Sequence, residues 1–385
     1  MSRCSHLDPV RQWPQERFAN EGDLKLDGIL SYMTQFDYEN LYFCQERETG
    51  LQAVIALHDT TLGPATGGCR MWTYASELDA IEDALRLARG MTYKYAAAGI
   101  NLGGGKCVVI GRHKSEALFR ALGRFIDRLG GAYITGEDVG TTLRDMEYIR
   151  METRYVVTLP REMGGAGNIA PATARGTLQG MRAACAAVFG TPDLDGRSVA
   201  VQGLGMVGAN VVEMLRAEGA TVYVADIDGP RAEQLAALHS ASVVPPDQIH
   251  SLEVDVFCPC ALGAVINDRT IPELHCQVIA GCANNQLATL EHGDRLRELG
   301  ILYAPDYIIN AGGTIFDTDR LLPGGFNEQR AWQHVDRIFE TTSKVLRTSA
   351  EEGISTARAA DLLAEQRLAG ARQVQNIRRD VRIDL

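Results

Sequence analysis

Apolar and polar residues recur along the chain in patterns that predict both strands and helices. The continuous apolar run 53–57 has the length and composition of a buried strand. An apolar stripe at helical spacing follows on Leu78, Ile81, Leu85 and Ala88. Ser76 stands just before this stripe and Asp79 completes a capping-box pattern, so a helix is predicted to begin here.

The sequence pattern changes near Gly196, where short apolar runs begin to alternate with helical stretches. The runs occupy residues 198–202, 221–225, 254–258, 277–280 and 301–304. Strands that alternate with helices favour a parallel sheet with covered faces, so the fold class is predicted as α/β with a doubly wound sheet in this half. From about Ala331 the pattern returns to amphipathic helix, and this flank is expected to rejoin the N-terminal part.

The first strand of the second half leads into a glycine-rich turn. The turn is Gly203-Leu204-Gly205-Met206-Val207-Gly208, and a helix-compatible stretch starts at Ala209. Gly203 allows a tight turn, Gly205 lets the backbone approach a pyrophosphate, and Gly208 allows close helix packing. The helix N-terminus offers unpaired N–H groups to the phosphates. This context, rather than the glycine spacing alone, predicts a dinucleotide-binding site.

An aspartate selects between the two nicotinamide dinucleotides. Asp226 ends the next strand, 23 residues after Gly203. A carboxylate at that place accepts hydrogen bonds from the adenosine ribose and repels a 2′-phosphate. The residues that follow, Ile227 and Asp228, offer no arginine to such a phosphate. NAD is therefore predicted as the cofactor in preference to NADP.

Two lysines stand out in the first half of the chain. Lys94 ends the stretch MTYK, and Lys106 follows three glycines in NLGGGK. A P-loop is excluded, because Ile100 stands where its first glycine belongs and Cys107 replaces the serine or threonine after the lysine. Two lysines in one pocket repel each other, which lowers the pKa of one so that it can act as a base, while the other binds a carboxylate.

A carboxylate completes this candidate site. Asp138 follows the apolar run 132–134, within Glu137-Asp138-Val139-Gly140, and its place after a strand suits a proton shuttle. A helix N-cap is the alternative interpretation of the same residue. Taken singly, a lysine is more often a solvated surface charge, so the hypothesis depends on the three side chains meeting in one pocket.

Charge and composition exclude several classes of function. The net charge of −11 disfavours nucleic acid and anionic membranes as partners. No apolar run approaches 18 residues and the N-terminal segment 1–15 lacks a hydrophobic signal core, so the cytoplasm is the expected location. The nine cysteines contain no CxxC pair and the eight histidines no HExxH pattern. Reduced, mostly buried thiols are expected, and no metal site is predicted.

At these residues the chain resembles the glutamate/leucine/phenylalanine/valine dehydrogenase family, and within it leucine dehydrogenases most closely. The similarity runs from about residue 28 to about residue 370. The stretches that carry it are IALHDTTLGPATGGCRMW (55–72), DALRLARGMTYKYAAAG (83–99), NLGGGK (101–106), GEDVGTT (136–142), FCPCALG (257–263) and YAPDYIINAGG (303–313).

The resemblance implies a role for each matching position. It puts the substrate α-carboxylate on Lys94, the catalytic base at Lys106 and the proton-transfer aspartate at Asp138. Positions that match residues near NAD are Arg70, Thr173, Cys260, Ala261, Ala283, Asn284 and Asn285, with Asn285 also close to the substrate. The implied reaction is reversible oxidative deamination of an L-α-amino acid to the 2-oxo acid and ammonia. Hydride leaves the substrate Cα for the nicotinamide, Lys106 activates water to attack the resulting iminium carbon, and Asp138 moves protons at the nitrogen.

The resemblance also implies an architecture. Residues 1–26 are expected to form an N-terminal extension. Residues 27–160, completed by C-terminal helices within 342–385, are expected to form the substrate and oligomerisation domain, and residues 161–341 the Rossmann-type NAD-binding domain. Family members are homo-oligomers with the active site in the cleft between two domains, and the same is expected here.

Departures from the family concern the substrate side chain. Leucine dehydrogenases line its pocket with aliphatic residues, whereas the matching positions here are Thr66, Gly136, Thr314 and Asp317. Gly136 is expected to free volume, and the other three add polarity. An unpaired charged carboxylate would cost several kcal/mol in a pocket for leucine. Asp317 therefore points away, faces a larger or polar substrate, or pairs with a cationic one.

The segment 164–168 and the pair Asn284-Asn285 also resemble phenylalanine dehydrogenases, so a bulkier or more polar substrate than leucine is predicted. Two alternatives belong to other classes. One is an NAD-binding regulatory subunit without catalysis, although all three catalytic positions hold competent residues. The other is a different NAD oxidoreductase, such as a 2-hydroxy acid dehydrogenase, which typically uses a histidine and an arginine where this chain has lysines.

Overall fold

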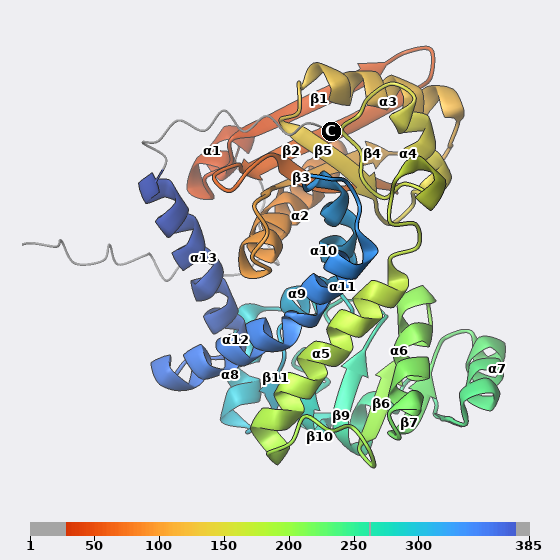
Figure 1. Ribbon diagram of the computed structural model, residues 1–385, viewed down its shortest axis with the longest axis vertical. Helices are drawn as coiled ribbons and strands as arrows, with labels where there is room; N and C mark the ends of the chain where they lie inside the picture. The colour runs from red at the N-terminus through yellow and green to blue at the C-terminus, as the bar shows by residue number, and fades with distance from the viewer. Residues whose placement is uncertain (1–27, 262, 375–385) are drawn as a thin grey trace, which may run out of the picture.

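The computed structural model describes residues 28–261 and 263–374, which form two α/β domains placed along the long axis of the molecule (Figure 1). The expected N-terminal extension 1–26 and the last part of the expected segment 342–385 lie outside the described residues. None of the described helices is long and apolar enough to cross a membrane.

The first domain is built on a five-stranded sheet in the order β1-β2-β4-β3-β5. The strands are β1 (Asn40–Glu46), β2 (Leu51–Asp59), β3 (Ala65–Trp72), β4 (Gly103–Ile110) and β5 (Tyr133–Glu137). β2 runs antiparallel to β1 and β4, whereas β3 runs parallel to β4 and β5. The carboxyl ends of β3, β4 and β5 therefore lie at one edge of the sheet.

Helices cover both faces of this sheet, which explains the apolar run of β2. Ile55 and Leu57 pack in the core with α3 (Glu116–Arg128) and α4 (Leu143–Arg150), and Val54 and Ala56 pack with α2 (Glu77–Ala97) and α1 (Ile29–Gln35). The predicted capping box at Ser76 is present at the start of α2. Leu78 was expected on the buried stripe of that helix, but it is 52% exposed, whereas Ala80 in the same first turn is buried against the sheet.

The second domain contains a six-stranded parallel sheet in the order β11-β10-β9-β6-β7-β8. Its strands are β6 (Ser198–Gln202), β7 (Thr221–Ala225), β8 (Ser242–Val243), β9 (Glu253–Pro259), β10 (His275–Ile279) and β11 (Leu302–Tyr303). Its helices are α5 (Ala170–Phe189), α6 (Met206–Ala217), α7 (Gly229–His239), α8 (Leu290–Glu298), α9 (Asp306–Ile309) and α10 (Gly312–Thr318). The predicted doubly wound α/β fold is confirmed, because strands and helices alternate and helices cover both faces.

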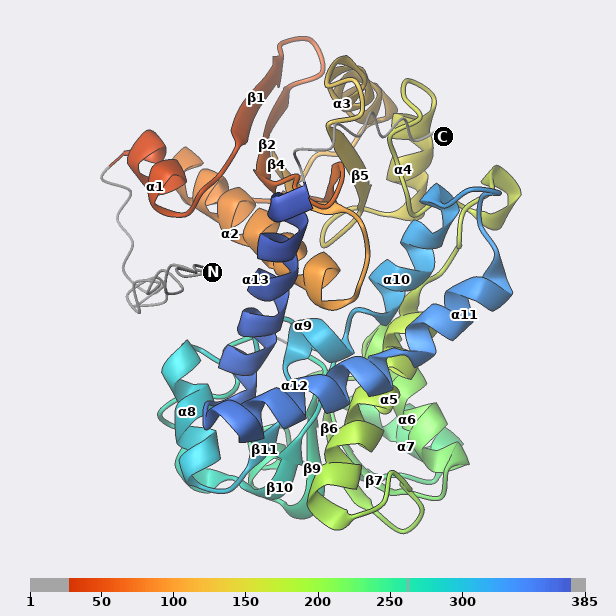
Figure 2. The ribbon, with the colours of Figure 1, turned by 60° about the vertical axis from the view of Figure 1, so that its left-hand side comes forward.

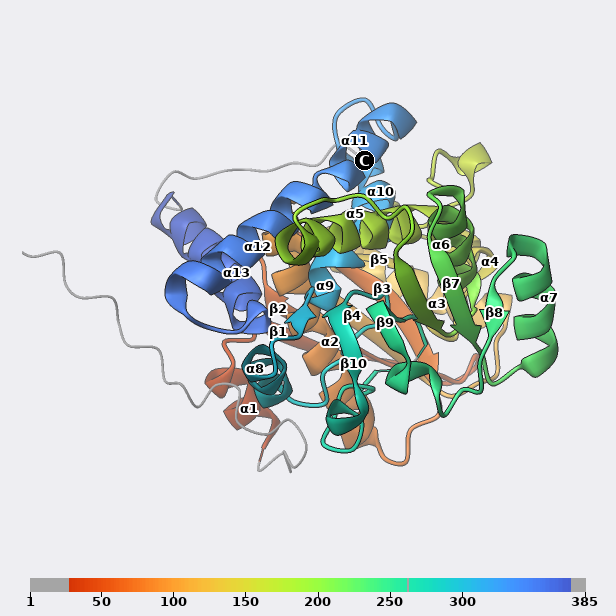
Figure 3. The same cartoon turned by 90° about the horizontal axis from the view of Figure 1, so that it is seen from below.

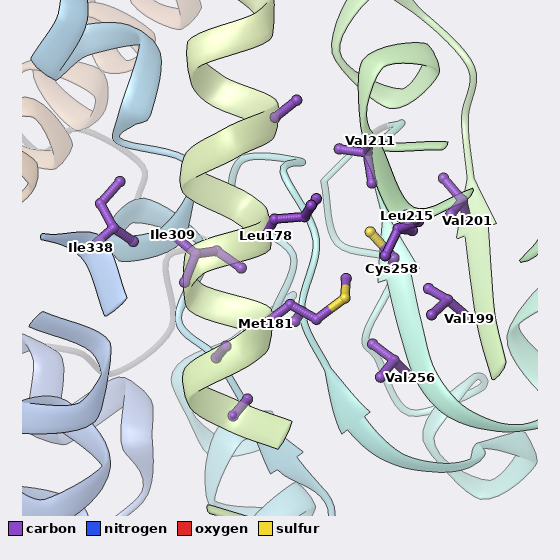
Figure 4. Packing of buried hydrophobic residues seen from close by; sticks show 14 of the residues in the cluster. Leu178, Met181, Val199, Val201, Val211, Leu215, Val256, Cys258, Ile309 and Ile338 are labelled. Atoms are coloured by element: carbon purple, nitrogen blue, oxygen red, sulfur yellow. The ribbon is translucent and has the colours of Figure 1, made fainter. Parts of the chain in front are cut away.

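The main core of this domain lies between the sheet and α5 and α6. Leu178 and Met181 of α5 face Val199 and Val256 on the sheet, and Ile309 packs on the other side of α5 (Figure 4). A Cβ on Gly180 would lie 2.0 Å from a side-chain carbon of Ile309, so glycine at this position allows α9 to approach α5. Figure 3 shows α5 beside α12 (Ile338–Glu352) on this face of the molecule.

The C-terminal helices return to the first domain later than expected. α11 (Glu328–Asp336) and α12 both pack against α5, and Val345 of α12 lies in the nucleotide-domain core, so this part of 342–385 belongs there. Only α13 (Thr356–Val374) runs back along α2 (Figure 2). Its Arg367 donates hydrogen bonds to the carbonyls of Tyr95, Ala96 and Ile100 at the end of α2, at distances of 2.9–3.0 Å.

Candidate active site

A cleft with a volume of about 1200 Å³ lies between the two domains. One wall carries Lys94, Lys106 and Asp138 from α2, β4 and the end of β5. The facing wall comes from the start of α6, the segment after β10 and the start of α10. The predicted catalytic constellation and the predicted nucleotide turn, which are about 100 residues apart in sequence, therefore meet in one site.

The glycines before Lys106 allow neighbouring elements to pack closely against β4. A Cβ on Gly104 would lie 2.1 Å from Thr92 Oγ1 on α2, and a Cβ on Gly105 would lie 2.9 Å from the ring of Tyr133. Such contacts are far inside van der Waals distance, so only glycine fits. Gly104 therefore allows α2, which carries Lys94, to pack closely against the strand that carries Lys106, and Gly105 makes room for Tyr133 of β5.

Asp138 joins the charged groups of the cleft. Its Oδ2 accepts hydrogen bonds from Lys106 Nζ at 2.8 Å and from Arg70 Nε at 3.1 Å. Burial alone would raise the pKa of Asp138, but the charges of Lys106 and Arg70 outweigh it and hold this pKa below its usual value. The N-cap of α4 is Thr142, so the alternative interpretation of Asp138 as a helix cap is wrong.

Lys94 is the lysine whose pKa is depressed. Burial lowers the pKa of Lys94 to about 8; the Asp306 carboxylate opposes this lowering and the Lys106 charge adds to it. The expected repulsion between the two lysines is thus present. It lowers the pKa of Lys94, the expected carboxylate anchor. A substrate carboxylate that contacts this amine would supply the negative charge that favours its protonated form.

The nucleotide turn has the shape that a dinucleotide needs. Gly203 adopts a φ of 98°, which is unfavourable for other residues. A Cβ on Gly208 would lie 2.1 Å from the Gly203 carbonyl oxygen, so α6 packs directly on the turn. Gly205 is the N-cap of α6, with no capping side chain and open space around its Cβ position, which leaves room for a phosphate. These features fit NAD.

Asp226 lies at the end of β7, where the ribose hydroxyls are expected. Its Oδ2 accepts a hydrogen bond of 2.7 Å from Leu204 N, and its Oδ1 accepts one of 2.9 Å from Asp228 N. Both bonds orient the carboxylate from the protein side. The next residue, Ile227, is 97% exposed and so forms an apolar surface beside the turn.

The other predicted cofactor residues occupy two layers. The cleft wall itself contains Arg70, Thr173, Met206, Val207, Asn284 and Asn285. Ala209, Cys260, Ala261 and Ala283 lie around the turn: Ala209 N bonds to Gly205 O, Cys260 N to Gln202 O and Ala283 N to Pro259 O, and a Cβ on Gly203 would contact Ala261. This second layer supports the turn from the ends of β6 and β9.

The four expected side-chain pocket residues are not all at the cleft. Thr314 lines it, whereas Thr66, Gly136 and Asp317 lie outside its lining. Asp317 is buried and accepts hydrogen bonds from Thr158 N at 2.8 Å and from Thr158 Oγ1 at 2.5 Å. A Cβ on Gly136 would lie 2.8 Å from Thr158 Oγ1, so Gly136 makes room for Thr158. Of the three possibilities for Asp317, the structure agrees with a carboxylate that points away from the cleft.

The sequence patterns did not reveal two charged residues of the site, Asp83 and Asp306. Asp83 binds Arg70 at 2.9 Å and accepts a hydrogen bond of 2.6 Å from Tyr74, which anchors Arg70 beside Asp138. Asp306 lines the cleft near Lys94, and burial raises its pKa. Asp83 looks in sequence like one more polar residue of an amphipathic helix. The signal for Asp306 was its position directly after a predicted strand, at the sheet edge where ligands bind.

Comparisons with known proteins agree with this site. The model of the Glu/Leu/Phe/Val dehydrogenase dimerisation domain matches residues 39–155, and that of the Glutamate/Leucine/Phenylalanine/Valine dehydrogenase domain matches residues 230–376. Leucine dehydrogenase of Bacillus cereus is 53% identical over 344 residues, 89% of this chain and 93% of the relative. Phenylalanine dehydrogenase of Bacillus thermotolerans is 46% identical over 340 residues, 86% of this chain and 88% of the relative. The crystal structure of L-tryptophan dehydrogenase from Nostoc punctiforme superposes with a TM-score of 0.79 at 42% identity, covering 90% of this chain and 100% of that one.

The fold and the cleft together define a dinucleotide-dependent oxidoreductase. The chain belongs to the glutamate/leucine/phenylalanine/valine dehydrogenase family. It is an amino acid dehydrogenase that acts on CH–NH₂ groups and uses NAD, as the sequence predicted. The alternative of an NAD-binding subunit without catalysis is not favoured.

Proposed function

We propose that this cleft oxidatively deaminates an L-α-amino acid with Lys94 as the carboxylate anchor, Lys106 as the catalytic base and Asp138 as the proton carrier. The observation that carries the proposal is the 2.8 Å contact between Lys106 and Asp138 on the wall that faces the nucleotide turn. A base and a proton carrier in direct contact can exchange a proton without solvent.

NAD would be held by the glycine turn and its supports. The N–H groups at the start of α6 would bind the pyrophosphate, Asp226 the adenosine ribose, and Thr173, Asn284 and Asn285 the part of the cofactor deeper in the cleft. When bound, NAD supplies the hydride acceptor for the substrate Cα.

The chain's own residues then handle the substrate and its protons. The Lys94 ammonium binds the α-carboxylate, since a buried cation gains most from a new counter-charge. Lys106 takes a proton from the water that attacks the substrate carbon. Asp138 transfers a proton to the nitrogen, which leaves as ammonia. Arg70, held by Asp83, keeps the Asp138 carboxylate oriented.

The test of these roles is substitution at the two central residues. We expect Lys106→Met and Asp138→Asn to lower kcat by about a thousandfold while the Kd for NAD, measured by isothermal titration calorimetry, stays within a factor of two or so, because general acid–base catalysis contributes about 10²–10⁴-fold. Lys344→Met, at an exposed position of α12, is the matched control. Full NADH production by the Lys106→Met variant would exclude its role as the base.

We infer that the substrate carries a bulky or polar-substituted side chain rather than that of leucine. Thr314 adds a hydroxyl group to the cleft wall, and relatives of known name include a phenylalanine and an L-tryptophan dehydrogenase at 46% and 44% identity. Asp317, satisfied by Thr158, gives no support to a cationic side chain. The measurement is kcat/KM for a panel of amino acids with NAD. Dominant turnover of leucine, isoleucine and valine would refute the inference.

We also propose that the enzyme is a homo-oligomer in the cytoplasm. Its substrate and oligomerisation domain would comprise residues 27–160 completed by the C-terminal helix α13, and its NAD domain residues 161–341 together with α12. Support for assembly comes from β1, an edge strand that exposes Phe43 to 62%, within a region that matches a dimerisation-domain model. All cysteines in the described part of the chain are free thiols, as in a reducing compartment. Sedimentation analysis of the purified protein tests the assembly, and a monomer at micromolar concentration would refute it. Cell fractionation tests the location.

A further inference from the structure

Three thiols meet at the carboxyl ends of β9 and β10. Cys258 is the last residue but one of β9, Cys260 directly follows this strand, and Cys282 comes shortly after β10. The sulfur atoms of Cys258 and Cys260 are 3.5 Å apart. Cys260 also forms a side-chain hydrogen bond with Cys282. Cys260 is therefore the central sulfur, with a potential disulfide partner on each side.

This thiol cluster supports the nucleotide turn. Cys260 N donates a 2.7 Å hydrogen bond to the Gln202 carbonyl, directly before Gly203. A Cβ on Gly208 would lie 3.3 Å from Cys260 Cβ, so the cysteine packs against the first turn of α6. Cys282 lines the cleft itself. A covalent change at Cys260 would thus act directly on the backbone that holds the cofactor.

Exposure and electrostatics distinguish this cluster from the remaining described cysteines. Cys260 and Cys282 are partly exposed, whereas every other cysteine in residues 28–261 and 263–374 is buried. Burial raises the pKa of Cys185 to about 11 and that of Cys276 to about 12. Hydrogen bonds from the Cys258 and Cys282 thiols lower the pKa of Cys260 instead. An acidic thiol in contact with Cys282, which lines the cleft, is the one that an oxidant entering the cleft attacks.

We propose that Cys260, with Cys258 and Cys282 as its two flanking thiols, is an oxidation site that reacts with hydroperoxides and closes a disulfide beneath the nucleotide turn. The Cys260 thiolate attacks one oxygen of hydrogen peroxide, the O–O bond breaks, and the leaving hydroxide takes up a proton to become water. The sulfenic acid formed on Cys260 is attacked by a flanking thiol, the S–O bond breaks, and a second water leaves. Two thiols lose two electrons and two protons, and the peroxide is reduced to two waters.

Closing the disulfide is expected to weaken NAD binding. The two sulfur atoms must approach from 3.5 Å to the covalent distance of about 2.05 Å. Pro259 stiffens the segment between Cys258 and Cys260, so the backbone of Cys260 moves with its sulfur and loosens its contacts with Gln202 and Gly208. A disulfide to Cys282 would pull on the same segment from the cleft side. Bound NAD, which would cover the cleft wall at Cys282, is expected to slow the reaction.

The experiment uses the full-length protein, reduced and then treated with hydrogen peroxide. Peptide mass mapping after alkylation identifies the linked cysteines, and calorimetry measures the Kd for NAD; both readouts are independent of catalysis and so of the roles proposed above. We expect Cys260 linked to Cys258 or Cys282, a Kd for NAD that rises about tenfold or more, and full recovery with dithiothreitol.

Two sets of variants make the test specific. Cys185→Ala, at a buried position of α5, should behave like the parent. In the double variant Cys258→Ala/Cys282→Ala, Cys260 has no partner for a disulfide and loses the hydrogen bonds that make its thiol acidic, so peroxide should leave the Kd for NAD of this variant close to its untreated value. If Cys260 stays unmodified in the parent under peroxide, or if its oxidised form binds NAD as tightly as the reduced protein, the proposal is overturned. The same holds if peroxide weakens NAD binding in the double variant as much as in the parent.

Discussion

Replacing Gly208 by alanine should weaken NAD binding through the shape of the turn alone. The added methyl carbon would lie 2.1 Å from the Gly203 carbonyl oxygen, whereas ordinary contact begins near 3.4 Å, so α6 must move away from the turn by more than 1 Å. Overpacking of this kind costs about 1–3 kcal/mol. Because the displaced N–H groups are those expected to bind the pyrophosphate, a similar loss in binding energy corresponds to a Kd for NAD about 5- to 150-fold higher.

Calorimetric titration with NAD, together with thermal unfolding, checks this expectation. Gly208→Ala should lower the melting temperature and raise the Kd. Gly205→Ala meets no atom within 4 Å, so it should leave the melting temperature unchanged and still raise the Kd, because its methyl group would occupy the expected phosphate position. Gly370 also has open space around its Cβ position but lies on α13, so Gly370→Ala is the control. It should neither lower the melting temperature nor raise the Kd for NAD. A Gly208→Ala variant with the parent's NAD affinity would refute this account of the turn.

Three other predictions follow from the charged groups. The Kd of a 2-oxo acid for the enzyme–NADH complex should rise above pH 8, where Lys94 loses its proton. Lys94→Arg should shift this rise beyond pH 10 or so, because arginine keeps its charge. A Kd that stays constant from pH 7 to 9 in the parent enzyme would contradict the role of Lys94 as the carboxylate anchor. Burial raises the pKa of Asp317 from 3.8 to about 6, so its stabilising contribution is complete below the lower value and lost as the pH rises through the upper one. In Asp317→Asn that dependence, roughly 2 kcal/mol between pH 4.5 and 7.5, should disappear from thermal unfolding compared at these two pH values. Arg70→Lys cannot contact Asp138 and Asp83 together, so kcat should fall about tenfold; an unaltered kcat would remove Arg70 from the positioning of Asp138.

Local patterns predicted the nucleotide domain well, because its features follow one another along the chain. The turn after β6 combines strand, glycines and helix within a dozen residues or so, and Asp226 stands at the end of the next strand. Each of these features depends on residues that are close together in the sequence. The strands of that sheet were accordingly located to within a few residues, apart from the two-residue β8.

Long-range contacts were the part that sequence patterns could not supply. Nothing local to Asp317 shows that Thr158, 159 residues away, donates two hydrogen bonds to its carboxylate. The same holds for Gly136, whose free space is filled by that threonine. Asp83 likewise became a site residue only through Arg70. Sequence motifs therefore predicted which reaction the cleft performs. The side chains that hold the cleft residues in place could be identified only from the three-dimensional structure.

The helix α13 has a consequence for recombining this enzyme with its relatives. It begins on the nucleotide domain, where Tyr307 donates a 2.7 Å hydrogen bond to Asp361, and ends on α2, where Arg367 satisfies three carbonyl groups. A chimera with a single junction near residue 160 would seat a foreign helix on the parental α2 and leave those carbonyls without their donor. Exchange of a block with two junctions, near residues 160 and 353, keeps the parental helix on α2. Only α13's contacts with the new block would then need to be re-engineered.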